Sequence, residues 1–171
     1  MRDVSYFVAC SLDGFIATMD DRFDWLFTDN DYGFDEFYRS VDCVVMGRRT
    51  FDVAMSFEEY PYAKRSAYVF TRRDVESPIP EAQFVREDPA RFVKKLKQEA
   101  GGRIWVVGGG IIATSLMQVG LIDELVLTIH PISLGQGVPL FAPHGTRSGW
   151  KLQSSKSWHN GLIQTTYRRS E

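Results

Sequence analysis

The feature that most constrains this chain is a series of short apolar runs, each about as long as a strand and each followed by a glycine or a polar turn. Residues 4–10, 43–46, 67–70 and 104–107 are runs of this kind. A run that is apolar on both faces is typical of a central strand covered from two sides. Helical segments lie between these runs, and this alternation predicts right-handed crossovers and a mostly parallel sheet.

The helical segments are recognised by their periodicity and by their ends. Short helices are predicted over residues 34–40, 49–55 and 111–119. The clearest helix begins at Asp88-Pro89, because the aspartate can cap it and a proline fits the first turn. We expect this helix to continue to Gly101, which would end it.

The last third of the chain is richer in strands. Residues 125–132 predict one strand, and residues 150–158 and 162–168 predict two more. Between the last two, His159-Asn160-Gly161 contains an Asn-Gly pair, which favours a two-residue hairpin turn. The closing hairpin should therefore add antiparallel strands at one edge of an α/β sheet.

Composition limits the classes of protein. A chain of 171 residues with 44% hydrophobic residues fits a single domain over residues 1–171. The net charge of −2 argues against nucleic acid or an anionic membrane as a partner, and no apolar run is long enough for a membrane span. With no signal-peptide pattern, and with Cys10 and Cys43 inside apolar runs, we expect a cytoplasmic protein with buried, reduced thiols. Three scattered histidines predict no metal site.

Three glycines mark the first candidate site. Gly108, Gly109 and Gly110 follow the strand at 104–107 and precede Ile111, where a helix begins. Glycines in this position let the backbone approach a phosphate, and the helix N-terminus offers unpaired N–H groups. The segment is not GxGxxG. A tight turn is the alternative, but one glycine would suffice for it, so three glycines favour phosphate binding.

Two further segments end strands with basic residues. Gly47, Arg48, Arg49 and Thr50 follow the strand at 43–46, where they predict a second diphosphate cradle. The alternative is a solvated helix start, although arginines there oppose the helix dipole. Thr71, Arg72 and Arg73 follow the strand at 67–70, and a clamp for a 2′-phosphate at this place would select NADPH over NADH.

The order of these motifs resembles the dihydrofolate reductase superfamily over nearly the whole chain. The stretch Gly108 to Phe141 looks more like the reductase domain of riboflavin biosynthesis, the RibD C-terminal type. The matching segments are Ser11-Leu12-Asp13-Gly14-Phe15-Ile16-Ala17, Met46-Gly47-Arg48-Arg49-Thr50-Phe51, Thr71-Arg72, Gly108-Gly109-Gly110, Leu125-Val126-Leu127-Thr128 and Gly135-Gln136-Gly137-Val138-Pro139-Leu140-Phe141.

The resemblance implies a three-layer fold with a central sheet of about eight strands and NADPH across its carboxyl edge. The two glycine segments, with Ile111, would flank the cofactor diphosphate. Thr71, Arg72 and Arg73 would lie toward the 2′-phosphate, and Ala9 and Ile16 toward the nicotinamide. A homodimer is also expected from the family.

On the substrate side, Asp24-Trp25 takes the place of the Pro-Trp pair of dihydrofolate reductase, so Trp25 is expected to contact substrate. The acid that grips the ring would be Asp31 or Asp35. Spacing from Gly47 favours Asp31, with Thr128 as its partner, and a helix cap is the alternative for Asp31. Asp13 is a rival catalytic residue, for which Asp-Gly turn chemistry is the alternative.

The function predicted is an NADPH-dependent reductase acting on a pyrimidine or pterin-like ring, resembling 5-amino-6-(5-phosphoribosylamino)uracil reductase. Dihydrofolate reduction is the alternative within this class. A non-catalytic nucleotide-binding module is the alternative from another class, because it would keep the glycines and arginines without needing an acid beside the ring.

Overall fold

The computed structural model describes residues 1–143 and 145–170, which contain ten strands and four helices. The strands are β1 (Val4–Ser11), β2 (Phe15–Ala17), β3 (Val41–Gly47), β4 (Ser66–Phe70), β5 (Ala82–Val85), β6 (Arg103–Gly108), β7 (Glu124–His130), β8 (Val138–Pro139), β9 (Trp150–Ser157) and β10 (Ile163–Arg169). The helices are α1 (Phe34–Ser40), α2 (Arg48–Ala54), α3 (Pro89–Leu96) and α4 (Gly110–Gln118).

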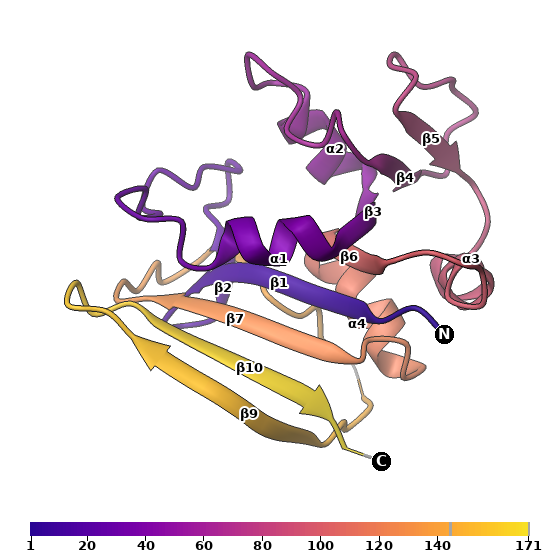
Figure 1. Cartoon of the computed structure of the whole chain (residues 1–171). Helices are drawn as coiled ribbons and strands as arrows, with labels where there is room; N and C mark the ends of the chain where they lie inside the picture. The colour runs from indigo at the N-terminus through magenta and orange to yellow at the C-terminus, as the bar shows by residue number, and fades with distance from the viewer. Residues whose placement is uncertain (144, 171) are drawn as a thin grey trace.

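Eight of the strands form one sheet in the order β5-β4-β3-β6-β1-β7-β10-β9 (Figure 1). Neighbours from β5 to β7 are parallel, whereas β10 runs antiparallel to both β7 and β9. The short strands β2 and β8 pair separately. The predicted α/β class, the mostly parallel eight-stranded sheet and the antiparallel C-terminal hairpin are therefore confirmed.

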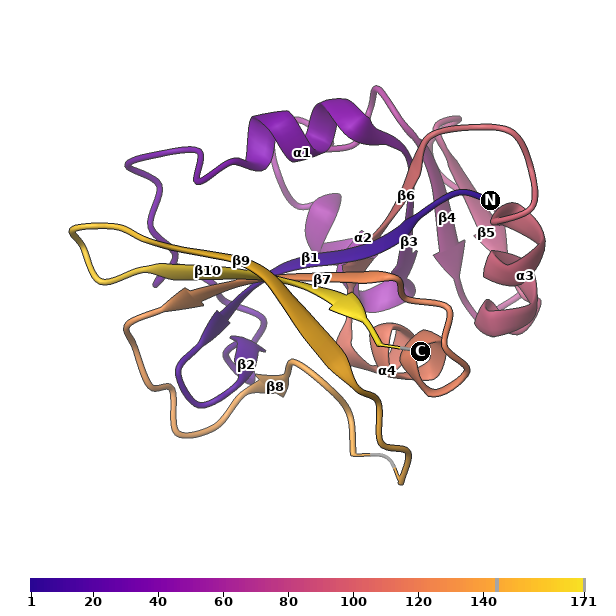
Figure 2. The same ribbon diagram turned by 60° about the horizontal axis from the view of Figure 1, so that its bottom comes forward.

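Helices cover both faces of the sheet. Tyr6 and Val45 belong to an apolar cluster that includes α3 and α4, whereas the adjacent Phe7 and Val44 belong to a cluster that includes α1 and α2. Figure 2 shows α1 and α4 on opposite sides of the sheet. Because both faces of the central strands are covered, their sequences are apolar without alternation, as expected.

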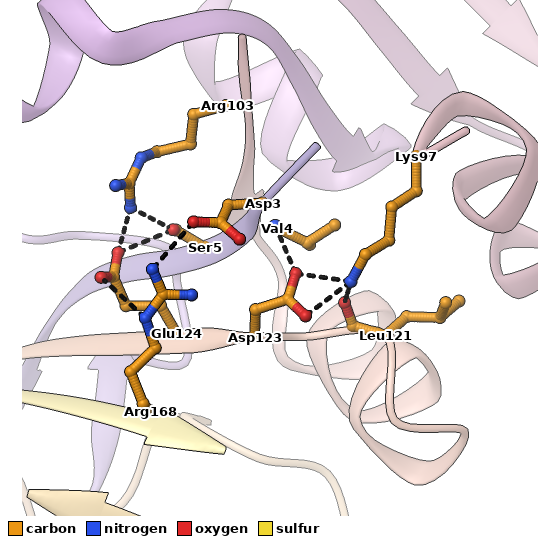
Figure 3. Close-up of polar contacts among 9 residues, drawn as sticks. All are labelled: Asp3, Val4, Ser5, Lys97, Arg103, Leu121, Asp123, Glu124 and Arg168. Carbon is orange, nitrogen blue, oxygen red and sulfur yellow. Dashed lines mark hydrogen bonds and ion pairs between the residues drawn. The ribbon is translucent and has the colours of Figure 1, made fainter. Parts of the chain in front are cut away.

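Two local predictions were wrong in detail. Helix α3 begins as predicted, with the Asp88 side chain accepting a hydrogen bond from the Arg91 N–H, but it ends at Leu96 instead of near Gly101. After Leu96 the backbone hydrogen bonds join residues three apart, as in tight turns. The Lys97 side chain pairs with Asp123, with Nζ 2.5 Å from Oδ2 (Figure 3).

The hairpin between β9 and β10 has a three-residue loop instead of the predicted two-residue turn. The Trp158 N–H donates to the Leu162 carbonyl, and the Gly161 N–H donates to the Trp158 carbonyl. Gly161 has φ 86°, the left-handed position that such a loop gives to glycine. Strands β2, β5 and β8 were not predicted, because runs of two to four residues carry little periodicity.

Charged side chains hold the amino edge of the sheet together (Figure 3). Arg103 pairs with Glu124 and donates to Ser5 Oγ at 2.5 Å. Arg168 lies 2.8 Å from Asp3 and 3.9 Å from Glu124. These contacts join β6, β1, β7 and β10, so the amino edge of the sheet is occupied by a structural network.

Both cysteines are buried free thiols, as predicted, and burial raises the pKa of Cys10 and of Cys43 to about 11. Within residues 1–143 and 145–170, no helix is long and apolar enough to cross a membrane. No group of three or more potential metal-ligating side chains is present in the same described ranges.

Candidate functional site

The strand ends predicted to hold a diphosphate lie side by side at the carboxyl edge. Strands β3 and β6 are neighbours, and Met46 pairs with Gly108. A Cβ built on Gly47 would lie 4.0 Å from the Gly109 nitrogen, and one built on Gly108 would lie 3.6 Å from Thr50 Oγ1. Gly47, Thr50, Gly108 and Gly109 therefore form one backbone-rich surface, which we call the glycine cradle.

The three consecutive glycines meet different requirements. Gly108 has φ 153°, a conformation that side chains rarely adopt. A Cβ on Gly110 would lie 2.4 Å from the Pro139 carbonyl oxygen, so packing against β8 excludes a larger residue there. Gly109 has φ −82°, and its Cβ would meet nothing closer than Thr50 Oγ1 at 3.7 Å. Backbone shape and packing explain Gly108 and Gly110 but not Gly109, as expected if Gly109 keeps a surface open for a ligand.

The two arginines beside the glycine cradle are engaged by carboxylates. Arg48 lies 2.6 Å from Asp52 and its guanidinium stands 4.9 Å from the centre of the Phe84 ring. Arg49 lies 2.7 Å from Asp21, in the loop between β2 and α1, and also donates to a carbonyl of that loop. An incoming diphosphate would therefore compete with Asp21 for Arg49. Ile111, in the first turn of α4, is 75% exposed.

Thr71, Arg72 and Arg73 follow β4, the next strand along the same edge. The Thr71 hydroxyl accepts a hydrogen bond from the Arg73 N–H at 3.1 Å, which shapes a tight turn. Both arginine side chains are exposed, and within the described residues neither forms an ion pair. Their role toward a 2′-phosphate stays a prediction.

On the other side of β6, a neutral polar pair occupies the edge. Ala9 on β1 is opposite Thr128 on β7, and Thr128 is opposite Gln164 on β10. Gln164 Nε2 donates to Thr128 Oγ1 and to the Tyr32 carbonyl, both at 3.0 Å. Thr128 is only 4% exposed, so its hydroxyl is sheltered from water, and the Gln164 side chain is half-buried.

The loop before α1 lies over the end of β7. Trp25 makes an edge contact with the His130 ring, with ring centroids 5.4 Å apart, and Phe27 lies 5.1 Å from the same ring. The histidine is buried at the last position of β7, two residues beyond Thr128 and on the same face. Trp25 lies beside β7. Its predicted contact with substrate stays a prediction. Ile16, on β2, packs against the core cluster that includes α4.

Residues 2–164 match the family model described as RibD C-terminal domain. The chain belongs to the RibD C-terminal domain family. Two relatives that match nearly the whole chain are the uncharacterized proteins YwjB and YyaP of Bacillus subtilis (strain 168). YwjB is 34% identical over 173 residues, covering 99% of each chain. YyaP is 33% identical over 172 residues, covering 94% of this chain and 91% of its own.

Solved structures share the fold. A protein of Shewanella sp. PV-4 that is provisionally assigned to riboflavin biosynthesis has a TM-score of 0.87 and 30% identity, with 100% of both chains covered. The diaminohydroxyphosphoribosylaminopyrimidine deaminase/5-amino-6-(5-phosphoribosylamino)uracil reductase of Thermotoga maritima has a TM-score of 0.75 and 14% identity, covering 99% of this chain and 57% of that chain. A pyrimidine reductase-like protein of Corynebacterium diphtheriae has a TM-score of 0.72 and 16% identity, covering 99% and 92%. The predicted place within the dihydrofolate reductase superfamily is confirmed.

In this member of the RibD C-terminal domain family, the predicted pairing of Asp31 with Thr128 is wrong. Asp31 is exposed, and its carboxylate accepts hydrogen bonds from the Gly33 and Asp35 N–H groups, both at 3.2 Å, as a cap of α1 does. Thr128 bonds instead to Gln164, because the C-terminal hairpin brings that residue opposite it. Asp35 is also exposed, in the first turn of α1.

Asp13 has the structural role in a turn that was its alternative assignment. Its carboxylate accepts hydrogen bonds from the hydroxyls of Ser11 and Ser133 and from the N–H groups of Leu134 and Gly135, at 2.6–3.1 Å. These bonds, that from Ser11 first, hold the pKa of Asp13 well below its ordinary range. A carboxylate stabilised in this way is a poor proton donor near neutral pH, so its geometry favours the structural role.

Sequence reasoning missed Gln164 and His130. Gln164 is a polar residue in the C-terminal hairpin, where many polar residues are merely solvated. His130 directly follows the Leu-Val-Leu-Thr-Ile run, and a histidine at the carboxyl end of a parallel strand was the available signal. The place of both residues in the site depends on contacts with residues that are distant in the sequence.

Proposed function

We propose that this member of the RibD C-terminal domain family is an NADPH-dependent reductase of a dioxopyrimidine ring, with 5-amino-6-(5-phosphoribosylamino)uracil as the model substrate. The observation that carries the proposal is the layout of the carboxyl edge. The glycine cradle lies on β3 and β6, the Thr128–Gln164 pair lies on β7 and β10, and only β1 with Ala9 separates them. A nucleotide cradle beside a small polar ring site is what hydride transfer requires.

The residues at the edge fit NADPH. The glycine cradle offers backbone and the Thr50 hydroxyl to a diphosphate, and the N-terminus of α4 adds unpaired N–H groups. Arg72 and Arg73 are exposed where a 2′-phosphate would meet them. Ala9 and Ile16 would border the nicotinamide.

The substrate side favours a ring that presents carbonyl oxygens. Because Thr128 Oγ1 accepts from the Gln164 amide, the threonine hydroxyl keeps its own proton to donate. A ring carbonyl of a dioxopyrimidine would accept it. A pterin has an amino group in place of one of these carbonyls. That amino group and the neighbouring ring N–H together call for a carboxylate, which Thr128 lacks as a partner.

Bound NADPH would supply a hydride, and the protein would orient the ring and keep water away from the reacting atoms. Thr128 and Gln164 would fix the ring through hydrogen bonds made in a sheltered place. The loop between β2 and α1 would cover the ring from the α1 face, since Trp25 and Phe27 already lie against β7.

NADPH oxidation, followed by absorbance, tests the proposal with the aminouracil phosphate and with dihydrofolate as substrates. We expect turnover with the aminouracil phosphate. Turnover with dihydrofolate alone would make the chain a dihydrofolate reductase. NADPH binding without turnover of either compound would favour the non-catalytic nucleotide-binding module, and a failure to bind NADPH would refute the proposal outright.

Cofactor selection has its own test. Replacing both Arg72 and Arg73 by Gln should weaken NADPH binding by about 10- to 150-fold for each charge-assisted hydrogen bond removed, and leave NADH binding unchanged. Arg91→Gln, an exposed arginine of α3, is the control for the loss of positive charge. Equal losses for NADPH and NADH would exclude the 2′-phosphate assignment.

A further inference from the structure

His130 is the one buried histidine of the described residues and has no part in the function proposed above. It is 3% exposed, at the carboxyl end of β7, opposite Ser11 of β1. Its Nδ1 lies 3.3 Å from the Thr128 carbonyl oxygen. Because a carbonyl only accepts, this hydrogen bond places the proton on Nδ1 and leaves a lone pair on Nε2.

Two buried nitrogen atoms in this contact have no partner. Within the described residues, His130 Nε2 and Trp25 Nε1 both lack a hydrogen bond, although water does not reach either atom. One is an acceptor and the other a donor, and their rings are in edge contact. Leaving such groups unpaired costs stability, so two of them together call for an explanation.

Burial lowers the pKa of His130, more than its bond to Thr128 raises it, so the ring stays neutral near pH 7. A neutral imidazole beside an indole N–H presents one acceptor and one donor, without charge, on the face of the sheet that also carries Thr128. The complementary ligand edge has an N–H next to a C=O. This is the edge of a cyclic amide.

We propose that His130 Nε2 and Trp25 Nε1 bind the amide edge of the substrate ring, the imidazole accepting from a ring N–H and the indole donating to the adjacent carbonyl. The inference rests on the proposed function for the class of ring and goes beyond it in naming two residues that select the ring. The ligand reaches these atoms when the loop between β2 and α1 shifts. That loop is held at its rim by exposed or half-exposed contacts, Arg49 with Asp21 and Phe23 with Phe57.

Nitrogen NMR of the histidine side chains in the full chain, with and without NADPH, tests the contact without any need for turnover. Uracil is the probe, and 1,3-dimethyluracil, which has no N–H, is the matched control. We expect uracil to shift the His130 Nε2 resonance away from the free lone-pair position and dimethyluracil to leave it there. Equal shifts with both compounds, or no shift at millimolar uracil, would overturn the proposal.

Variants separate recognition from packing. His130→Leu should weaken uracil binding by about 10-fold, the loss of one hydrogen bond, while NADPH affinity is unchanged. Its melting temperature should not fall, because the variant removes a buried unpaired nitrogen. His130→Gln, whose amide oxygen can accept in place of Nε2, should recover part of the affinity. If His130→Leu melts earlier and binds uracil as the wild type does, His130 is a packing residue only.

Failure of this contact and failure of the proposed function give different results. A chain that binds uracil through His130 but never oxidises NADPH would refute the reductase and leave this contact standing. If the His130→Leu variant reduces the aminouracil phosphate as well as the wild type does, the reductase stands and this contact is refuted.

Discussion

Asp21→Asn is expected to tighten NADPH binding, because Asp21 is paired with Arg49, the arginine that we expect to contact the diphosphate. Asp21 Oδ2 lies 2.7 Å from Arg49 Nε, and Arg49 directly precedes Thr50 of the glycine cradle. Binding of the cofactor through Arg49 must first break this ion pair. Removing the charge of Asp21 removes that cost.

The size of the effect follows from the exposure of the pair. The Arg49 side chain is 62% exposed and that of Asp21 is 31% exposed, and such ion pairs contribute about 0.2–1 kcal/mol. The gain in affinity should therefore be at most about fivefold, and it should shrink at high salt. Asparagine is suited to the position, since Asp21 has φ 61° and asparagine adopts this region readily.

Asp20→Asn is the matched control. Asp20 is the preceding residue and pairs with Arg22 instead, so the variant loses the same charge without releasing Arg49. Calorimetric titration with NADPH at low and high salt should separate the two variants. An equal gain in both would indicate a general charge effect, and a loss or no change for Asp21→Asn would refute a diphosphate contact by Arg49.

Four further substitutions each test a single residue. Gly109→Ala should leave the melting temperature nearly unchanged and weaken NADPH binding by about 10-fold or more. Gly110→Ala should instead destabilise the fold by about 1–3 kcal/mol. The opposite pattern in the two melting curves would contradict the glycine cradle. Asp31→Asn should cost up to about 1 kcal/mol of stability and little activity, as expected for a helix cap. If hydride transfer in a single-turnover assay is about 10²–10⁴-fold slower in this variant, Asp31 is the catalytic acid after all. Because the pKa of Asp13 is lowered, its carboxylate stabilises the fold above the ordinary pKa of 3.8, and this contribution is lost as the pH falls below that value. The stability of Asp13→Asn should therefore fall less steeply with decreasing pH than that of the wild type below about pH 4, as measured by acid unfolding.

The parts of the fold that sequence predicts well depend on local signals. Apolar runs gave the central strands, and the bounds of α1 follow from its own periodicity, as do the capped start of α3 and the glycines at strand ends. The presence of Gly47 and Gly108 at the same edge could also be predicted, since parallel strands end at one edge whatever their order. That β3 and β6 are neighbours depends on the strand order, which the sequence did not predict. The prediction failed where a residue depends on the register between two strands that no short turn connects.

Thr128 illustrates that dependence. Its partner lies 36 residues further on, in a strand that reaches it only through the hairpin between β9 and β10. A slip of one residue turns every side chain of a strand to the opposite face. The three-residue loop closed by Gly161 sets the register between β9 and β10, whereas Gln164 faces Thr128 through the register between β10 and β7, for which the sequence carries no turn signal. The pairing of Asp31 with Thr128 was predicted from spacing along the chain. The partner that Thr128 has in the structure, the neutral amide of Gln164, comes from pairing across the sheet. It is this pairing that favours a ring rich in carbonyl groups.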